Sequence, residues 1–391
     1  MGKIIELNQS HYDEVFSLSQ FAFQYELTEE ELHRKKEEAE GYTIWGMMDE
    51  EKLAAKLHLI PLSVSINNSP FQMGGIASVA TWPEYRRKGM VKELLLHALQ
   101  TMKAQGQTIS FLHPFSAPFY RQYGWEMAFA EKHYEIPMKN LKQNWDGKGY
   151  VRRTNSNIPL LDSIYRKYIK NYNGAILRDE KWWKQRVLKD QRMIAVSYNE
   201  ENQAEGYIIY QLKDRVFKVD EVVYCTTNAL KVLLQFIANH DSMAEKVEMV
   251  VPENDLLPLL VNEPRFQQNI IPYFMARIVD VEAFLKQYMR SNPTDFGSLS
   301  IRVEDSFIEE NTGIYILQGT DGKVDISYKP IMNSIKAPMI SCTVQQLTSM
   351  LLGYQRPEDL YHLGLIDGTT QAIEILEHLI PRKQTYFPDF F

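Results

Sequence analysis

Cysteine is nearly absent from this sequence, since its 391 residues include only Cys225 and Cys342, far apart and without a CxxC spacing. Such a pair is typical of free thiols in a reducing compartment and excludes a disulfide-built domain. No apolar run approaches the roughly 18 residues of a membrane-spanning helix, and the N-terminal residues lack the long apolar segment of a signal peptide. We therefore expect a cytoplasmic protein that does not cross a membrane.

Metal ligands and positive charge are also scarce. The nine histidines are scattered, with no pair at the i, i+4 spacing beside a carboxylate, so we expect no metal site. The 43 Lys and Arg residues are outnumbered by 50 Asp and Glu, which gives a formal net charge of −7. Because nucleic-acid binding depends on clustered Lys and Arg, we do not expect nucleic acid as the main partner. An acidic surface instead tolerates cationic small molecules.

What the sequence does contain is enough apolar residues for more than one core. Hydrophobic residues make up 45% and charged residues 24% of the chain, as in ordinary globular proteins. A length of 391 residues exceeds what one core usually serves, so two or three domains are expected. Helix and strand patterns are mixed throughout, with strands expected at 205–212, 216–224, 298–303 and 313–318, and helices at 344–352 and 370–379.

The clearest pattern lies in residues 76–112. Residues 76–81 are a short apolar run that suits a buried strand, and residues 82–88 form a polar turn. A helix is expected to open at Gly89 and to end near Gly106. Its apolar residues repeat at the spacing of one helical face, namely Val91, Leu94, Leu95, Ala98, Leu99 and Met102. Residues 108–112 are expected to form the next strand, so the unit is a strand, a basic loop, a helix and a strand.

This order of elements makes a general site for an anion. The first N–H groups of a helix lack partners within the helix, and the helix dipole adds positive potential there. Arg86, Arg87 and Lys88 add formal charge, and Gly89 lets the backbone approach a phosphate closely. A Walker loop is excluded because no Gly-Lys-Ser/Thr follows at the required spacing, and a single glycine excludes a Rossmann fingerprint.

The same residues resemble a known superfamily. Arg86-x-x-Gly89-x-Val91 resembles the R/Q-x-x-G-x-G/A motif of the GNAT acetyltransferases, although Val91 stands where Gly or Ala is common. The preceding strand and the later segment Tyr120-x-x-x-Gly124-Trp125 are similar to further GNAT segments. The resemblance implies acetyl-CoA as the cofactor, with the coenzyme A diphosphate on the loop and its pantetheine arm along the strand. The residues so implied are Val79, Ala80, Thr81, Arg86, Arg87, Lys88, Gly89, Met90 and Val91.

In detail the sequence is similar to the enhanced intracellular survival (Eis) branch of the GNAT proteins, through residues 83–89 and 118–124 and through an aromatic C-terminus. The resemblance implies an α/β (α+β) fold with tandem GNAT-like domains followed by a sterol-carrier-like domain. We place these domains at 1–145, 146–280 and 281–391. The family forms hexamers and acetylates amines, including aminoglycosides and, in some members, polyamines or lysine side chains. The resemblance therefore implies a homo-oligomer such as a hexamer.

The resemblance also implies a catalytic pair. Attack of an amine on the thioester expels a thiolate, and a tyrosine within hydrogen-bond reach can donate a proton to that sulfur. Tyr120 is the expected acid, with Tyr123 as the competitor. In the family the C-terminal carboxylate is the base, which here is the α-carboxylate of Phe391. Asp389 offers a second carboxylate nearby, and a tail that merely packs is the plain alternative.

The acceptor site is the least defined part of the expectation. GNAT proteins place their first helices over the acceptor cleft, so we expect Gln24, Tyr25, Glu26 and Trp45 to line it. Glu26 could neutralise a cationic acceptor such as an aminoglycoside or a polyamine. Two other functions stay open: a protein lysine acetyltransferase on the same scaffold, and a lipid-binding or structural protein in which the sterol-carrier-like region dominates.

Overall fold

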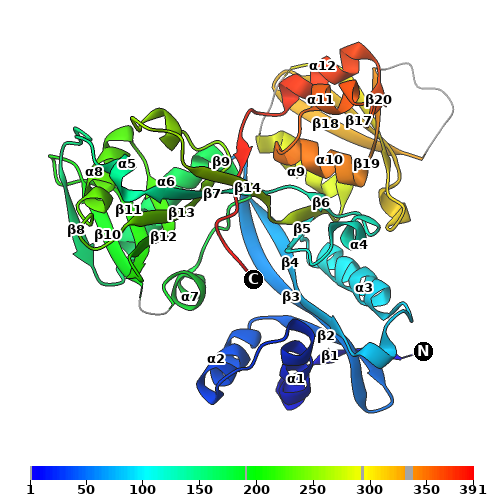
Figure 1. Cartoon of the computed structure of the whole chain (residues 1–391). Helices are drawn as coiled ribbons and strands as arrows, with labels where there is room; N and C mark the ends of the chain where they lie inside the picture. The colour runs from blue at the N-terminus through cyan, green and yellow to red at the C-terminus, as the bar shows by residue number, and fades with distance from the viewer. Residues whose placement is uncertain (1, 190–191, 292–294, 331–337) are drawn as a thin grey trace. The chain divides into compact units, whose positions relative to one another are not determined.

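A computed structural model describes residues 2–189, 192–291, 295–330 and 338–391. It divides the chain into two compact units (Figure 1). The first comprises the chain up to Ala128, residues 274–381 and Phe391, and the second comprises residues 129–273 and 382–390. Both mix helices with sheets, so the expected α/β class is confirmed. Within the described residues, no helix is both long and apolar enough to span a membrane.

The first unit contains a seven-stranded sheet in which β4 and β5 are the parallel pair and the other neighbours are antiparallel. In sheet order its strands are β1 (Lys3–Leu7), β2 (Thr43–Asp49), β3 (Lys52–Ile66), β4 (Ser69–Thr81), β5 (Ile109–Leu112), β15 (Met275–Ile278) and β6 (Glu126–Met127).

Helices cover both faces of this sheet (Figure 1). α3 (Met90–Ala104) packs on one face through the apolar positions expected from the sequence, with Leu94, Leu95 and Leu99 against Leu57 and Ile76. α1 (Tyr12–Phe23) packs on the opposite face, followed by α2 (Glu29–Ala39), which begins at a Thr28 capping box. Alternate residues of β3 therefore face different helices. The helix expected between Gly89 and Gly106 is confirmed.

The pairing of β3 with β4 contains a bulge. Lys56 pairs with Ala80 but His58 pairs with Ala77, so the single residue between them opposes both Ser78 and Val79. Ser78 has φ +52°, in the left-handed region. One extra residue bends a strand and increases its twist locally. The bulge lies where β4 runs on past β5, because the parallel pairing with β5 stops at Ile76.

The described residues of the C-terminal part of the first unit form a separate five-stranded sheet and four α-helices. In sheet order the strands are β18 (Lys323–Lys329), β17 (Gly313–Thr320), β16 (Gly297–Glu304), β19 (Met339–Thr343) and β20 (Asp367–Gly368). The helices are α9 (Val281–Ser291), α10 (Val344–Leu352), α11 (Pro357–His362) and α12 (Thr370–Leu379). The strands and helices expected in this region are confirmed.

The second unit repeats the plan of strand, helix and parallel strand. β12 (Val216–Tyr224) is followed by α8 (Thr227–Ala238) and then by β13 (Lys246–Pro252), which pairs with β12 in parallel. The full sheet order adds β14 (Gln267–Pro272), β7 (Ala130–Pro137), β11 (Ala204–Lys213), β10 (Met193–Tyr198) and β8 (Tyr150–Thr154), as β14-β7-β13-β12-β11-β10-β8. The strands expected at 205–212 and 216–224 are confirmed.

Two strands join a different sheet from the one that the sequence suggests. β7 lies before the boundary that we place at 145 but pairs with β13 and β14 in the second unit. β15 lies before the boundary at 280 but pairs with β5 and β6 in the first. The alternation of apolar residues shows that a segment is a strand and does not show which neighbours it takes. The compact units therefore change over after residues 128 and 273, and again after residues 381 and 390.

Candidate functional site

The loop between β4 and α3 has the geometry that the sequence indicates. A 3-10 turn at Pro83–Tyr85 leads to Arg86, Arg87, Lys88 and Gly89, all exposed, and α3 begins at Met90. Gly89 is the residue before the helix, with φ +79°. A Cβ atom there would meet nothing within 4 Å, so the conformation and not the space favours glycine. The loop thus presents positive side chains and the unsatisfied N–H groups of a helix N-terminus together.

The strand that precedes the loop offers a free edge. Beyond Ile76, β4 continues to Thr81, and among the described residues no strand pairs with this stretch on the β5 side. It contains Val79, Ala80 and Thr81, of which Ala80 is buried and the other two are partly exposed. An unpaired strand edge exposes N–H and C=O groups that an extended amide-bearing ligand can bind. The edge runs directly into the basic loop at residues 86–89, so one extended ligand can bind the strand edge and the loop together.

Tyr120 lies on the short helix α4 (Ala117–Arg121) and is only 3% exposed. Its ring packs against Phe115, Phe119 and Trp125. Burial raises the pKa of Tyr120 well above the usual value of a tyrosine, so its phenol stays protonated. The pKa of Tyr123 is raised in the same direction by burial, although this side chain is partly exposed. Both tyrosines can donate a proton, so their roles stay a prediction.

A residue that the sequence does not single out supports the turn at residues 122–124, which follows α4. Arg277 of β15 is completely buried and donates a hydrogen bond to the main-chain carbonyl of Tyr123. Its other terminal nitrogen donates to Asp305 at 2.6 Å, and the guanidinium lies 5.6 Å from the centre of the Trp125 ring. Gly124 has φ +90°, and a Cβ atom there would collide with the Arg277 side chain. The Tyr-x-x-x-Gly-Trp segment is thus shaped around a buried arginine.

Phe391 packs on the same strand that carries the free edge. Its side chain is 8% exposed, and its ring lies where a Cβ atom on Gly75 of β4 would come within 2.8 Å of it. The ring also meets Phe274 edge to face at 5.1 Å between centroids. Burial of the aromatic tail is confirmed for Tyr386, Phe387 and Phe391, whereas Phe390 is 56% exposed.

Asp389 is a structural anchor of the tail. In the second unit its carboxylate accepts hydrogen bonds from Arg178 Nε at 3.0 Å and from Trp182 Nε1 at 2.8 Å. Arg178 also pairs with Glu221, and both arginine and carboxylates are buried. Burial, only partly offset by Arg178, raises the pKa of Asp389. Two residues of the tail, β21 (Gln384–Thr385), extend this attachment by pairing with β9 (Tyr172–Asn173).

The structure separates the expected acceptor residues. Tyr25 and Glu26 follow α1, where Tyr25 hydrogen-bonds with Ser19 and lies near Lys35 of α2. Trp45 of β2 instead packs in the cluster under α3, edge to face with His97 at 4.2 Å. Ile44, the neighbour of Trp45 in β2, packs with residues of α1 on the other face of the sheet, which is the face that α1 and the residues after it cover. The structure therefore places Trp45 apart from Tyr25 and Glu26, and the role of all three in acceptor binding stays a prediction.

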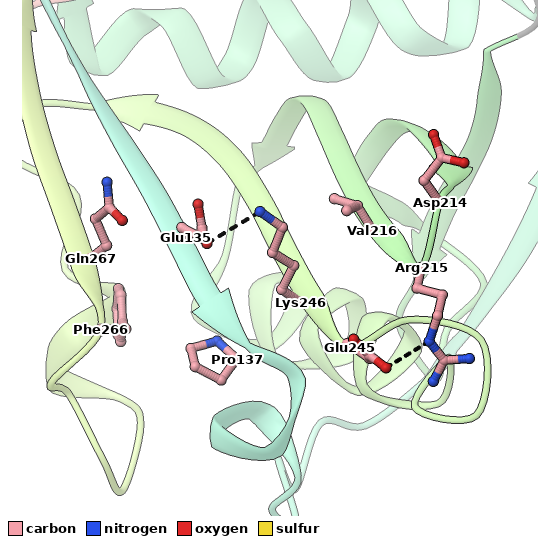
Figure 2. Close-up of a pocket in the computed structure, with 9 residues that line it drawn as sticks. All are labelled: Glu135, Pro137, Asp214, Arg215, Val216, Glu245, Lys246, Phe266 and Gln267. Carbon is pink, nitrogen blue, oxygen red and sulfur yellow. Dashed lines mark hydrogen bonds and ion pairs between the residues drawn. The ribbon is translucent and has the colours of Figure 1, made fainter.

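The second unit offers a hollow of another kind (Figure 2). This hollow of about 430 Å³ is lined by Glu135, Pro137, Asp214, Arg215, Val216, Glu245, Lys246, Phe266 and Gln267. Two ion pairs, Lys246 with Glu135 and Arg215 with Glu245, occupy its wall. Such exposed pairs neutralise each other. None of the expected site residues is among those that line it.

The second unit also lacks the chemistry of the first loop. Between β12 and α8 the chain reads Cys225-Thr226-Thr227, and Thr226 caps the helix with its own side chain. This connection has neither basic residues nor glycine. The elements are therefore repeated, but the anion site belongs to the first unit.

Comparison with known proteins agrees with this picture. Residues 3–128 and 174–278 match two acetyltransferase (GNAT) domain families, and residues 281–388 match a sterol carrier protein domain. A crystal structure from Enterococcus faecalis, described as a probable N-acyltransferase of unknown function, is 26% identical, with a TM-score of 0.92 and 100% of both chains covered.

Two curated relatives are more distant. The N-acetyltransferase Eis of Mycobacterium tuberculosis is 23% identical over 64% of each chain. An uncharacterized N-acetyltransferase of Streptomyces avermitilis is 21% identical over 60% of this chain and 63% of its own length. The chain thus spans less than two thirds of the length of both relatives.

Proposed function

Because this chain is a GNAT acetyltransferase of the Eis family, with acetyl-CoA as its cofactor, we propose that it transfers the acetyl group directly to the amine of a cationic small molecule. One observation carries the proposal: the free edge of β4 runs into a basic loop at the N-terminus of α3. This juxtaposition suits a ligand with an amide-bearing arm at one end and a diphosphate at the other.

The described residues fit that cofactor in detail. Arg86, Arg87 and Lys88 are exposed and would neutralise the phosphates, and the N–H groups from Gly89 to Val91 would donate to them. Val79, Ala80 and Thr81 would bind the pantetheine arm through their main-chain groups. Acetyl-CoA supplies the activated acetyl thioester, and the protein supplies its position.

Two groups of this chain are proposed to move protons. The acceptor ammonium must lose one proton before its nitrogen can attack, and we assign this proton to the α-carboxylate of Phe391. Attack breaks the C–S bond, and Tyr120 donates its phenolic proton to the leaving sulfur. The amide nitrogen then gives up its second proton, which restores the phenol. Burial keeps this phenol protonated, so its proton is in place when the sulfur leaves.

Charge supports the acceptor class that the family resemblance implies. The chain carries a formal net charge of −7, and an acidic surface raises the local concentration of cations. Glu26 is exposed beside Tyr25, where it could contact an ammonium group. We therefore propose an aminoglycoside-like or polyamine-like acceptor, and, by the family resemblance, a cytoplasmic homo-oligomer such as a hexamer.

The test is the release of free thiol from acetyl-CoA in the presence of aminoglycosides, polyamines, a lysine-containing peptide and neutral amines. Faster release with the polycations than with the peptide supports the proposal. Release with the peptide alone would assign the enzyme to protein lysines instead. Gly89→Asp is the control, because a folded protein without the cofactor site should release no thiol with any acceptor.

A further inference from the structure

A lysine is buried in the first unit without a carboxylate. Lys56 of β3 is completely buried, and among the described residues no Asp or Glu forms an ion pair with it. Its Nζ lies 2.7 Å from Ser19 Oγ, 2.6 Å from Ser78 Oγ and 3.2 Å from His58 Nε2. A buried lysine is uncommon, and one without a counter-charge is costly if it stays protonated. The position therefore needs an explanation.

The three neighbours suit a neutral amine. Burial, reinforced by the charge of Lys35, holds the pKa of Lys56 well below its usual value. A neutral amine has two N–H donors and one lone pair. Ser19 gives its own proton to the carbonyl of Val15 and so accepts from Lys56. Ser78 can take the second N–H, and the lone pair is left for an N–H of His58.

Ser78 is the partner that connects this lysine to the candidate site. It is one of the two residues in the β4 bulge, and it holds φ +52° inside a strand. This conformation is unfavourable for a residue with a Cβ atom unless its surroundings maintain it. Two hydrogen bonds to the Ser78 hydroxyl do so, from Lys56 at 2.6 Å and with Ser19 at 3.2 Å. The next residues, Val79 to Thr81, form the free strand edge.

We propose that Lys56 is a positioning residue for the acyl-CoA: its amine holds Ser78 in the left-handed conformation, and this keeps the β4 bulge in the shape that the thioester arm binds. The inference rests on the proposed function, because it assigns the pantetheine arm to this edge. It differs from a catalytic role, since Lys56 touches Ser78 and not the reacting atoms.

Rescue by glycine is the decisive test. Glycine adopts a positive φ without strain, so a Ser78→Gly protein should keep the bulge without an anchor. Lys56→Met, which removes the amine but keeps a long apolar side chain, should weaken acetyl-CoA binding about five- to thirtyfold, the range that the left-handed penalty predicts. The double variant Lys56→Met/Ser78→Gly should return to within about twofold of Ser78→Gly alone. Calorimetry with acetyl-CoA measures all three.

A matched control and a second readout complete the design. Lys52→Met removes a lysine from the exposed start of the same strand and should bind acetyl-CoA as the wild type does. The KM of the acceptor should also stay constant, because a bulge that holds the cofactor does not contact the acceptor.

The outcomes separate the two proposals. Unchanged affinity in a folded Lys56→Met protein overturns the anchoring role. A loss that Ser78→Gly cannot rescue overturns it as well, because Lys56 would then affect cofactor binding by a route other than the conformation of Ser78. If the wild type itself binds no acetyl-CoA, the proposed function fails first. A double-mutant cycle of unfolding free energies between Lys56 and Ser78 then still tests the anchor, and additive losses would overturn it.

Discussion

Arg277 donates a hydrogen bond to the main-chain carbonyl of Tyr123, from 154 positions away in the sequence. The same guanidinium pairs with Asp305, which also accepts hydrogen bonds from the main chain of Phe307 and from the side chain of Asn311. The turn after the proposed catalytic tyrosine is therefore tied to the sterol-carrier-like part of the chain. Within the first unit, that part helps to build the candidate site.

The first prediction concerns this tie. Arg277→Met should lower the free energy of unfolding by about 3–5 kcal/mol, because it leaves the Asp305 carboxylate buried without its partner. Urea denaturation measures the loss. Arg265→Met is the control, since its pair with Glu263 is exposed and should change stability little. Equal effects of the two substitutions would contradict the assignment.

The second prediction concerns charge at the loop. Gly89→Asp should weaken acetyl-CoA binding far more than Gly89→Asn. Both side chains tolerate a positive φ and have nearly the same shape, and only the aspartate repels phosphate. Isothermal titration calorimetry gives both affinities. Similar affinities for the two variants would remove the diphosphate from this loop.

The third prediction is that Tyr120→Phe lowers turnover by about 10²–10⁴-fold, as expected for loss of a general acid, while acetyl-CoA affinity stays nearly constant. Steady-state kinetics and calorimetry together separate the two effects. Tyr123→Phe is the matched variant in the same segment. If it loses more activity than Tyr120→Phe, the acid is Tyr123.

The fourth prediction separates the terminal carboxylate from Asp389. Residues added after Phe391 should abolish acetyl transfer but leave acetyl-CoA binding intact. Asp389→Asn should be mild, because the amide oxygen can still accept from Arg178 and Trp182. Asp389→Ala should cost about 1–3 kcal/mol of stability, since it leaves those buried donors unpaired. Full activity of a C-terminally extended enzyme would exclude the terminal base.

The fifth prediction is a pH dependence from Lys56. Unfolding returns this lysine to its ordinary pKa of about 10.4, so the unfolded chain binds a proton that the folded chain does not. Stability relative to Lys56→Met should therefore rise with pH from the lowered pKa of Lys56 up to about 10.4, by roughly 1.4 kcal/mol per pH unit. His58 and Lys35 face the same amine and are present in both proteins. If the free energies of unfolding of the wild type and of Lys56→Met changed with pH in parallel, Lys56 would be charged in the folded protein.

The sequence was sufficient where local patterns decide the structure. The helix after Gly89 follows from apolar residues on one face, and the loop follows from basic residues beside a glycine. The same reasoning located α10 and α12. These features depend on neighbours within a few turns, which a single sequence displays directly.

Contacts between distant segments could not be read in this way. Lys56 looks like an ordinary polar residue of a strand, and its burial depends on Ser19 of α1 and Ser78 of β4. Trp45 was grouped with Tyr25, yet it pairs with Leu57 of β3 and packs with it in the cluster under α3. No sequence pattern marks the role of Arg277, because its partners lie more than a hundred residues earlier and 28 residues later. Such positions are set by packing.

The place of β15 has a consequence for synthesis of the chain. This strand lies between β5 and β6 and is the partner through which β6 joins the sheet, yet it comes more than a hundred residues after both. While the polypeptide emerges from the ribosome, the first sheet stays incomplete beside β5 until residues 275–278 have been synthesised. In a recombinant fragment that ends near residue 145, β5 would remain an unpaired edge strand. Unpaired edge strands promote aggregation. The sheet that carries the proposed acetyl-CoA site is thus complete only in a chain that extends beyond the proposed cofactor loop by nearly two hundred residues.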